Sequence, residues 1–230
     1  LRMAHNPASR ALLDACDELG MYVMDEIYDG WYIPKDYHDY SRQFFDGYKS
    51  DLASMVKKDM NHPSVILYSV GNEVSETVEK KGIALGAEMR DYIKSLDDTR
   101  PVTCGVNVLL DVYASLGIGV YRDKGRYKPA LLPEDGVYKE KKTGSAFFNA
   151  MTQKLGGLMF FMSKGNLAEK IICRFAPSVD IVGLNYASSR YDTDLQKYKE
   201  RMMVGTETMV ADLPYNWERV KTHKALIGDF

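Results

Sequence analysis

Two glutamates stand where a side chain could do chemistry. Glu73 follows an apolar run and an asparagine, and Glu207 follows a shorter apolar run and is flanked by threonines. If both runs are strands of one parallel barrel, both carboxylates point into the same mouth. One carboxyl group can then protonate a leaving oxygen while the other attacks or activates water, as glycoside hydrolysis requires. An acidic residue at the end of a strand is more often a cap or part of a salt bridge. A catalytic role for Glu73 and Glu207 therefore requires a fold that brings the two residues together.

The segments around these glutamates alternate between short apolar runs and helical periodicity. The apolar runs predict strands at residues 21–24, 64–70, 101–106, 179–184, 203–205 and from 225 onward. Helical spacing of apolar residues predicts helices at residues 7–19, 48–60, 76–96, 193–202 and 216–223. Uninterrupted apolar strands that alternate with helices indicate a parallel sheet covered on both faces.

Polar residues at the C-terminal ends of these strands favour an α/β fold of the TIM-barrel type, (β/α)8. A doubly wound nucleotide-binding sheet would carry a glycine-rich phosphate loop after its first strand, and none is present. With an opening stub, about seven strand positions are counted, against the eight of a complete barrel. The chain opens on Leu1 without an initiator methionine and stops on the strand that reaches Phe230. We therefore expect residues 1–230 to be a fragment of one catalytic domain that lacks the first strand and the region after the last.

One segment breaks the alternation. Between residues 109 and 177 a long insertion replaces the expected single helix. It contains a basic loop at 122–128, a charged stretch at 134–142 and an apolar helical part at 146–175. Long insertions of this kind often shape a substrate cleft. Lys154 and Lys164 interrupt the apolar part, so we expect it to pack against the barrel rather than to act as a membrane surface, subunit contact or lid.

Composition argues against several other classes of protein. The 230 residues are 45% hydrophobic, and their formal net charge of −2 gives no reason to expect nucleic acid or an anionic membrane as partner. The longest apolar stretches fall short of the roughly 20 residues that span a bilayer. Cys16, Cys104 and Cys173 are widely spaced and odd in number, which favours reduced, buried thiols over a disulfide framework. A fragment leaves localisation open, and both a cytoplasmic and a periplasmic bacterial enzyme fit.

Two stretches carry a closer likeness. The motif Arg2-x-x-His5-Asn6-Pro7 precedes a run from residue 12 to 26, and residues 59–73 read DMNHPSVILYSVGNE. Together they resemble the barrel of family 2 glycoside hydrolases, which includes β-galactosidases, β-glucuronidases and β-mannosidases, and the second stretch resembles the acid/base signature of that family. Outside the insertion, the resemblance extends from Arg2 to Phe230. It implies a retaining hydrolase, for which the two carboxyl groups lie about 5–5.5 Å apart.

The resemblance also implies roles for residues at matching positions. Glu73 matches the general acid/base, and Asn72 matches a residue that hydrogen-bonds the sugar 2-hydroxyl. Glu207 falls at the end of the seventh strand, where the family places its nucleophile. Tyr186 matches a tyrosine that contacts the nucleophile, and His5 matches a histidine that binds the sugar.

Three further residues are assigned around this set. Asp25 and Glu26 end the third strand and are expected to form active-site scaffold at the substrate, and Trp31 is a candidate for stacking on a sugar. The binding assignments have structural alternatives. His5 could hold its loop, Tyr186 could be a buried tyrosine with a satisfied hydroxyl, and Trp31 could be a surface aromatic.

The sequence ranks several functions. A β-galactosidase comes first because residues 69–74 look more like its signature than like that of a mannosidase, and a β-glucuronidase comes second. A non-catalytic carbohydrate-binding barrel is the alternative of another class, although the presence of both Glu73 and Glu207 argues against it. A metal-dependent hydrolase needs a cluster of ligands at strand ends, and of the four histidines just His5 ends a strand.

The expected partner is a carbohydrate, with a homo-oligomer of the full-length protein left open. No cofactor is required for the expected chemistry, no metal ligands are assigned, and a structural or activating Mg²⁺ or Na⁺ is not readable from the sequence.

Overall fold

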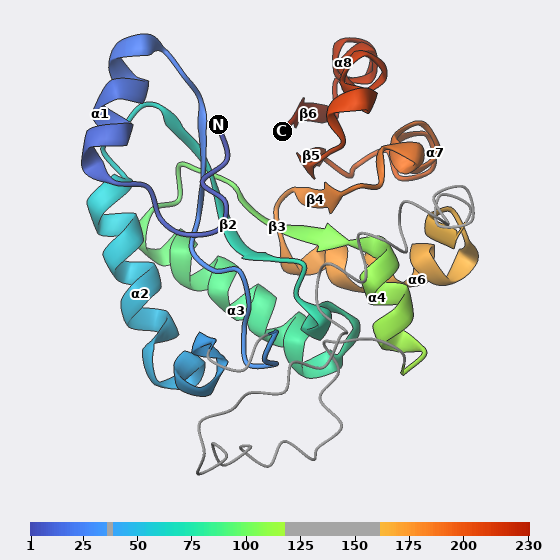
Figure 1. Cartoon of the computed structure of the whole chain (residues 1–230), viewed down its shortest axis with the longest axis horizontal. Helices are drawn as coiled ribbons and strands as arrows, with labels where there is room; N and C mark the ends of the chain where they lie inside the picture. The colour runs from blue at the N-terminus through green and yellow to red at the C-terminus, as the bar shows by residue number, and fades with distance from the viewer. Residues whose placement is uncertain (36–38, 118–161) are drawn as a thin grey trace, which may run out of the picture.

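The computed structural model describes residues 1–35, 39–117 and 162–230. Its centre is one curled sheet of six parallel strands, each hydrogen-bonded to the next in chain order (Figure 1). The strands are β1 (Val23–Glu26), β2 (Val65–Asn72), β3 (Val102–Asn107), β4 (Val182–Asn185), β5 (Met203–Glu207) and β6 (Leu226–Asp229). Arg2 adds an isolated parallel bridge to Met24, at the predicted opening stub. The prediction of an incomplete TIM barrel is confirmed.

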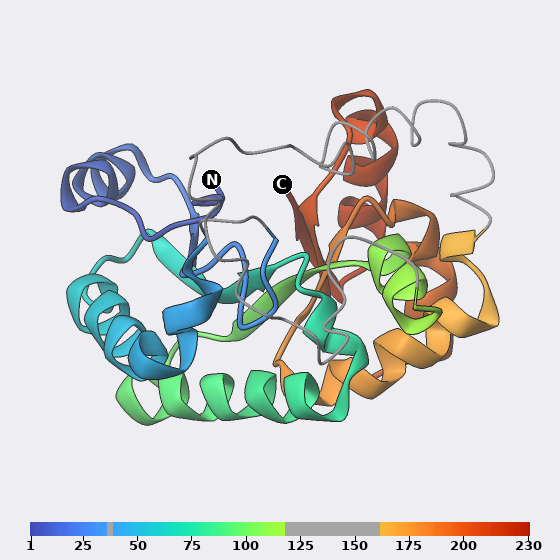
Figure 2. The same ribbon diagram turned by 60° about the horizontal axis from the view of Figure 1, so that its bottom comes forward.

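Helices separate the strands along the chain. They are α1 (Arg10–Leu19), α2 (Phe44–Asp59), α3 (Lys80–Leu96), α4 (Val108–Ser115), α6 (Asn166–Phe175), α7 (Tyr191–Lys197) and α8 (Leu213–Thr222). Short 3-10 turns adjoin them: η1 (Tyr40–Gln43), η2 (Ser75–Val78), η3 (Ala176–Ser178), η4 (Ser188–Arg190) and η5 (Val210–Asp212). Figure 2 shows α2, α3 and α6 along one side of the sheet.

Local sequence sets the ends of α1, which directs the chain into β1. The hydroxyl of Ser9 accepts a hydrogen bond from the backbone N–H of Leu12, as an N-cap does. Gly20 ends the helix with a φ of 67°, a left-handed conformation that glycine adopts without steric cost. β1 starts three residues after Gly20, and its last residue, Glu26, lies at the C-terminal edge of the sheet.

The two faces of the sheet have different environments. The larger apolar cluster contains Val23 and packs under the helices, whereas a smaller cluster contains Met24, Leu67, Ile181 and Val204. Because successive residues of a strand point to opposite faces, these clusters lie on opposite sides of the strands. The smaller one fills the inner, concave face, and the polar strand ends lie beyond it.

The insertion has narrower limits than predicted. Residue 109, at its expected start, belongs to α4, and its last residues belong to α6 and η3; α4 and α6 contact each other. α6 lies within the helical part predicted at 146–175, whereas α4, which contacts β3, was not predicted as a helix. Residues 118–161 lie outside the described residues, and with them the basic loop, the charged stretch and most of the apolar part.

Two smaller expectations concern membranes and thiols. No helix in the described ranges is long and apolar enough to cross a membrane. All three cysteines are free; Cys16 and Cys104 are buried, while Cys173 is partly exposed.

Candidate active site

The two glutamates meet at the C-terminal edge of the sheet, although 134 positions separate them in the chain. Glu73 directly follows β2 and Glu207 ends β5. The side-chain nitrogen Nδ2 of Asn185, which ends β4, lies 3.1 Å from Oε1 of Glu73 and 3.1 Å from Oε2 of Glu207. These two oxygens, one from each carboxyl group, are therefore at most about 6.2 Å apart.

Strained backbone surrounds the pair. Glu73 has a φ of 47° and Tyr186 a φ of 54°, so two residues with side chains occupy the left-handed region. Such conformations cost on the order of 1–3 kcal/mol each and cluster at functional sites. Hydrogen bonds hold both in place: the N–H of Glu73 donates to Gly105 O at 2.7 Å, and that of Tyr186 donates to Glu207 O at 2.8 Å. The strand edge thus fixes the direction of both side chains.

Arg2 links Glu207 to two neighbouring side chains of the site. Its guanidinium donates to Glu207 Oε2 at 3.0 Å, to Asn72 Oδ1 at 2.7 Å and to Glu26 Oε2 at 2.9 Å. Burial acts to lower the pKa of Arg2, but Glu26 and Glu207 outweigh it and the pKa is raised. Gly105 makes room for this group, because a Cβ there would lie 3.0 Å from Arg2 Nη2.

Asn72 and His5 extend the same network. While Asn72 Oδ1 accepts from Arg2 and Asn185, its Nδ2 donates to Asp29 at 3.0 Å. His5 Nδ1 lies 2.7 Å from Oε1 of Glu26, which is fully buried. A β-bulge in the pairing of β2 with β3 between Ser69 and Asn72 accompanies the turn of Asn72 toward this network.

Tyr186 acts on Glu207 directly. Its hydroxyl donates to Glu207 Oε1. Burial first, and then this hydrogen bond, raise the pKa of Tyr186, so the hydroxyl keeps its proton and remains a donor. Donors of Arg2, Asn185 and Tyr186 therefore all lie within hydrogen-bonding distance of the Glu207 carboxylate.

Two predicted site residues lie elsewhere. Asp25 points to the outer face of β1, where its Oδ1 accepts from the N–H of Ala8, so it does not face the other site residues. Trp31 is fully buried and its indole N–H donates to Val70 O at 2.8 Å. The stacking role predicted for Trp31 does not fit this burial, because the ring packs in the core below the end of β2.

The structure adds residues that were not selected from the sequence. Asn185 and Asn107 both end strands, and Asn107 Nδ2 donates to Glu73 Oε1 at 2.8 Å. The sequence feature that could have identified both asparagines was their position at the ends of strands. Arg2 stood inside the family motif, but a single arginine near the start of a chain gave no reason to select it. Lys35, on the loop after β1, donates to Asn72 O at 2.7 Å and had no signal in the pattern.

A possible cation-binding group lies away from these residues. Within the described ranges, Asp14, Asp17 and His62 bring ligand atoms within 4.8 Å of one another. They belong to α1 and to the loop before β2, at the opposite ends of the strands from the glutamates. Asp17 accepts from the backbone N–H of Ser64 at 2.9 Å and so has a structural role there.

A parallel α/β barrel with paired carboxylates at its C-terminal edge is the architecture of a glycoside hydrolase. The sequence model described as "Glycosyl hydrolases family 2, TIM barrel domain" matches residues 1–142, and the chain belongs to this family.

Individual relatives agree with this membership. A β-galactosidase of Bacteroides ovatus is 36% identical over a match that covers 46% of this chain and 16% of that enzyme. Human β-glucuronidase is 32% identical, with 44% of this chain and 15% of the enzyme covered. The chain therefore matches less than a fifth of the length of either relative.

Solved structures give the same fold. A family 2 glycosyl hydrolase from Bacteroides cellulosilyticus superposes with a TM-score of 0.70 at 30% identity, covering all of this chain and 22% of that one. A β-glucuronidase from Ruminococcus gnavus shares the fold, with a TM-score of 0.55 at 15% identity over 100% of this chain and 35% of its own.

Proposed function

We propose that this chain is the catalytic core of a retaining β-glycosidase, with Glu73 as general acid/base and Glu207 as nucleophile. The observation that carries the proposal is the shared contact of both carboxylates with Asn185 Nδ2, at 3.1 Å each. This contact limits the distance between Glu73 Oε1 and Glu207 Oε2 to at most about 6.2 Å, a bound that accommodates the about 5–5.5 Å of retaining enzymes.

The hydrogen bonds divide the two roles. Donors of Arg2, Asn185 and Tyr186 orient Glu207, whose carboxylate attacks the anomeric carbon and forms a glycosyl ester. Oε1 of Glu73 accepts hydrogen bonds from Asn107 and Asn185. Oε2 is therefore the oxygen that gives its proton to the departing glycosidic oxygen. Glu73 then takes a proton from water, the water oxygen replaces the ester bond to Glu207, and the sugar leaves with its configuration retained.

The favoured substrate is a β-galactoside. Residues 69–74 support this ranking, because they look more like the β-galactosidase signature than like that of a mannosidase. The relatives carry both names, β-galactosidase and β-glucuronidase, so the second remains the alternative to test.

Covalent labelling tests nucleophile and sugar together. The full-length protein is treated with a 2-deoxy-2-fluoro-galactoside, digested and mapped by mass spectrometry, with Glu207→Gln as control. We expect the adduct on Glu207 and none in the variant. Labelling by a fluoro-glucuronide alone would keep the mechanism and change the substrate. Absence of labelling by any fluoro-sugar would favour a non-catalytic carbohydrate-binding barrel.

A further inference from the structure

Asn107 lies at the junction of a strand and a helix, and its side chain has a contact with each of two partners. It is the last residue of β3 and the N-cap of α4, which starts at the next residue. Its Oδ1 accepts hydrogen bonds from the backbone N–H groups of Leu109 and Leu110, both at 3.2 Å. Its Nδ2 donates to Glu73 Oε1 at 2.8 Å. One amide group therefore caps the helix with its oxygen and contacts Glu73 with its nitrogen.

The cap determines the direction of this amide. An asparagine side chain accepts hydrogen bonds through its oxygen and donates them through its nitrogen. A turned amide would place Nδ2 against two N–H groups of α4 and Oδ1 against a carboxyl oxygen, so both contacts would be lost. Nδ2 of Asn185 also lies near Asn72 Oδ1 and Glu207 Oε2, and so divides its hydrogens among several acceptors. Among the described residues, Asn107 is therefore the amide donor whose nitrogen contacts Glu73 alone.

The backbone around this contact is held by packing. The N–H of Glu73 donates to Gly105 O on β3 at 2.7 Å. η2 follows Glu73 in the chain, as α4 follows Asn107, and η2 contacts α4. The hydroxyl of Thr77 on η2 lies 2.6 Å from Asp111 Oδ2 on α4, and both side chains are buried. The distance between Asn107 and Glu73 is therefore set by the fold as well as by the two side chains.

The contact on Oε1 also defines the place of the proton on Glu73. Because Oε1 already faces the N–H groups of two amides, the proton of the carboxylic acid lies on Oε2. A carboxyl group is planar, so a fixed Oε1 limits the directions that Oε2 can take. A general acid must lie within about 2.6–3.2 Å of the oxygen that it protonates, and a displacement of about 1 Å can lower the rate about 10²-fold.

We propose that Asn107 is a positioning residue for proton transfer: α4 holds its amide, and the amide holds Glu73 so that the proton on Oε2 reaches the departing oxygen. The inference rests on the proposed function for the role of Glu73. It assigns the first turn of α4 a part in the reaction, through the cap that directs the amide of Asn107.

Dependence of the rate on the leaving group tests the proposal. A phenolate leaves slowly without a proton, whereas a 2,4-dinitrophenolate leaves readily as an anion, so misplacement of the acid slows the first substrate alone. We would measure kcat/KM of the full-length protein for phenyl and 2,4-dinitrophenyl β-galactosides, or for the glucuronides if those label Glu207. Asn107→Ser keeps a side chain that caps α4 and removes the amide donor. Asn107→Asp keeps the cap and the shape but presents a carboxylate to Glu73.

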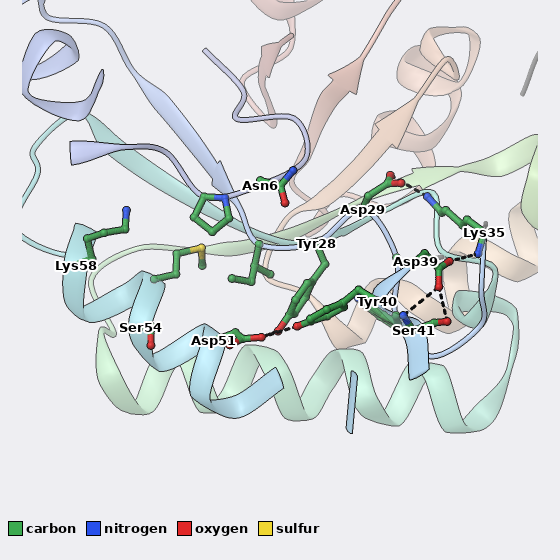
Figure 3. A pocket seen from close by; sticks show the side chains of 15 residues that line it. Asn6, Tyr28, Asp29, Lys35, Asp39, Tyr40, Ser41, Asp51, Ser54 and Lys58 are labelled. Atoms are coloured by element: carbon green, nitrogen blue, oxygen red, sulfur yellow. Dashed lines mark hydrogen bonds and ion pairs between the residues drawn. The ribbon is translucent and has the colours of Figure 1, made fainter. Parts of the chain in front are cut away.

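Two control variants separate this effect from a general loss of structure. Ser9→Ala removes the N-cap of another helix, α1. Asp51→Asn changes a second loop: Figure 3 shows Asp51 beside Tyr28 and Tyr40 in a cavity of about 550 Å³, and both tyrosine hydroxyls contact its carboxylate. In the described part of the chain, no residue that lines this cavity is bonded to Glu73.

We expect both Asn107 variants to lower kcat/KM for the phenyl substrate about 10- to 100-fold and to leave the dinitrophenyl substrate within about threefold of wild type. Glu73→Gln should show the same preference more strongly, and the Ser9→Ala and Asp51→Asn controls should show none, even where they lower the melting temperature. Equal losses on both substrates, or no loss in Asn107→Ser, would reduce Asn107 to a helix cap and overturn the proposal. Equal losses in Glu73→Gln would overturn it together with the role of Glu73, while labelling of Glu207 reports separately on the nucleophile.

Discussion

At the residue scale, Asn185 is the junction of the site. Its Nδ2 lies 2.9 Å from Asn72 Oδ1 and 3.1 Å from one oxygen each of Glu73 and Glu207. One amide nitrogen carries two hydrogens, so three acceptors share two donors. The hydroxyl of Thr206 donates to Asn185 Oδ1 at 2.6 Å and thereby fixes which end of the amide faces the carboxylates.

Asn185→Asp tests this junction. The substitution keeps the shape but places a carboxylate among three oxygen acceptors, so we expect kcat/KM of the full-length protein to fall about 10²- to 10³-fold, as for loss of a preorganised donor. Steady-state kinetics on an aryl β-galactoside measure the change, and Asn61→Asp at an exposed position is the matched control. Unchanged kcat/KM in the first variant would show that the junction does not contribute to catalysis.

The residues of the site differ in how far the sequence revealed them. Strand ends of a parallel sheet meet at one edge, so Glu73 and Glu207 could be paired from the chain alone. Asp25 could not be separated from Glu26, because adjacent residues of a strand face opposite sides and the pattern VMDE does not say which side is inner. Lys35 comes from a loop whose path depends on contacts made after folding, so no periodicity marks it.

At the element scale, apolar runs predicted the strands and their order, since a strand covered on both faces must be apolar throughout. Residues 166–175 of the predicted apolar helical part form α6, whereas α4, which directly follows β3, was not predicted. The position of α4 depends on its contact with α6, which no local pattern contains.

The contact between β1 and α2 contains a buried acid pair. Asp25 and Asp59 are both fully buried, and Oδ2 of Asp25 has no partner unless a proton lies between the two carboxyl groups. Burial, and then the hydrogen bond with Asp59, raise the pKa of Asp25 to about 7. Lys58 contacts Asp59 at 2.5 Å and compensates its charge. The pair therefore holds one proton when α2 is docked on β1.

This proton links stability to pH. From about pH 4 to pH 7 the folded protein keeps a proton that the unfolded chain releases, so the free energy of unfolding falls as pH rises through this range. Asp25→Asn does not titrate and can still donate to Asp59. We expect its free energy of unfolding, relative to wild type, to rise by about 2–3 kcal/mol between pH 5 and pH 8. Urea denaturation of the full-length protein at both pH values measures this change, and the same difference at both would exclude a shared proton.

At the scale of the whole molecule, the sheet is a curled half-barrel with two end strands. In the described part of the chain, β6 pairs with β5 on one side alone, and β1 pairs with β2 and the bridge from Arg2. Large apolar side chains are exposed near β6: Val210 is 88% exposed and Trp217 50% exposed. An open strand edge beside exposed apolar side chains favours strand addition between molecules.

The 230-residue polypeptide by itself should therefore self-associate at micromolar concentration through β6. Ile227 lies on this end strand and is 39% exposed, and Ile66 lies on the inner strand β2 with a similar exposure of 36%. A lysine on an edge strand opposes pairing with a second chain, so we expect Ile227→Lys to lower the associated fraction at least about threefold and Ile66→Lys to leave it unchanged. Light scattering after size-exclusion chromatography measures the fraction, with circular dichroism to check that both variants keep their secondary structure. Equal behaviour of the two variants would move the association away from β6, and a monomeric wild-type polypeptide with a cooperative melting transition would show that the half-barrel is stable with its edges unpaired.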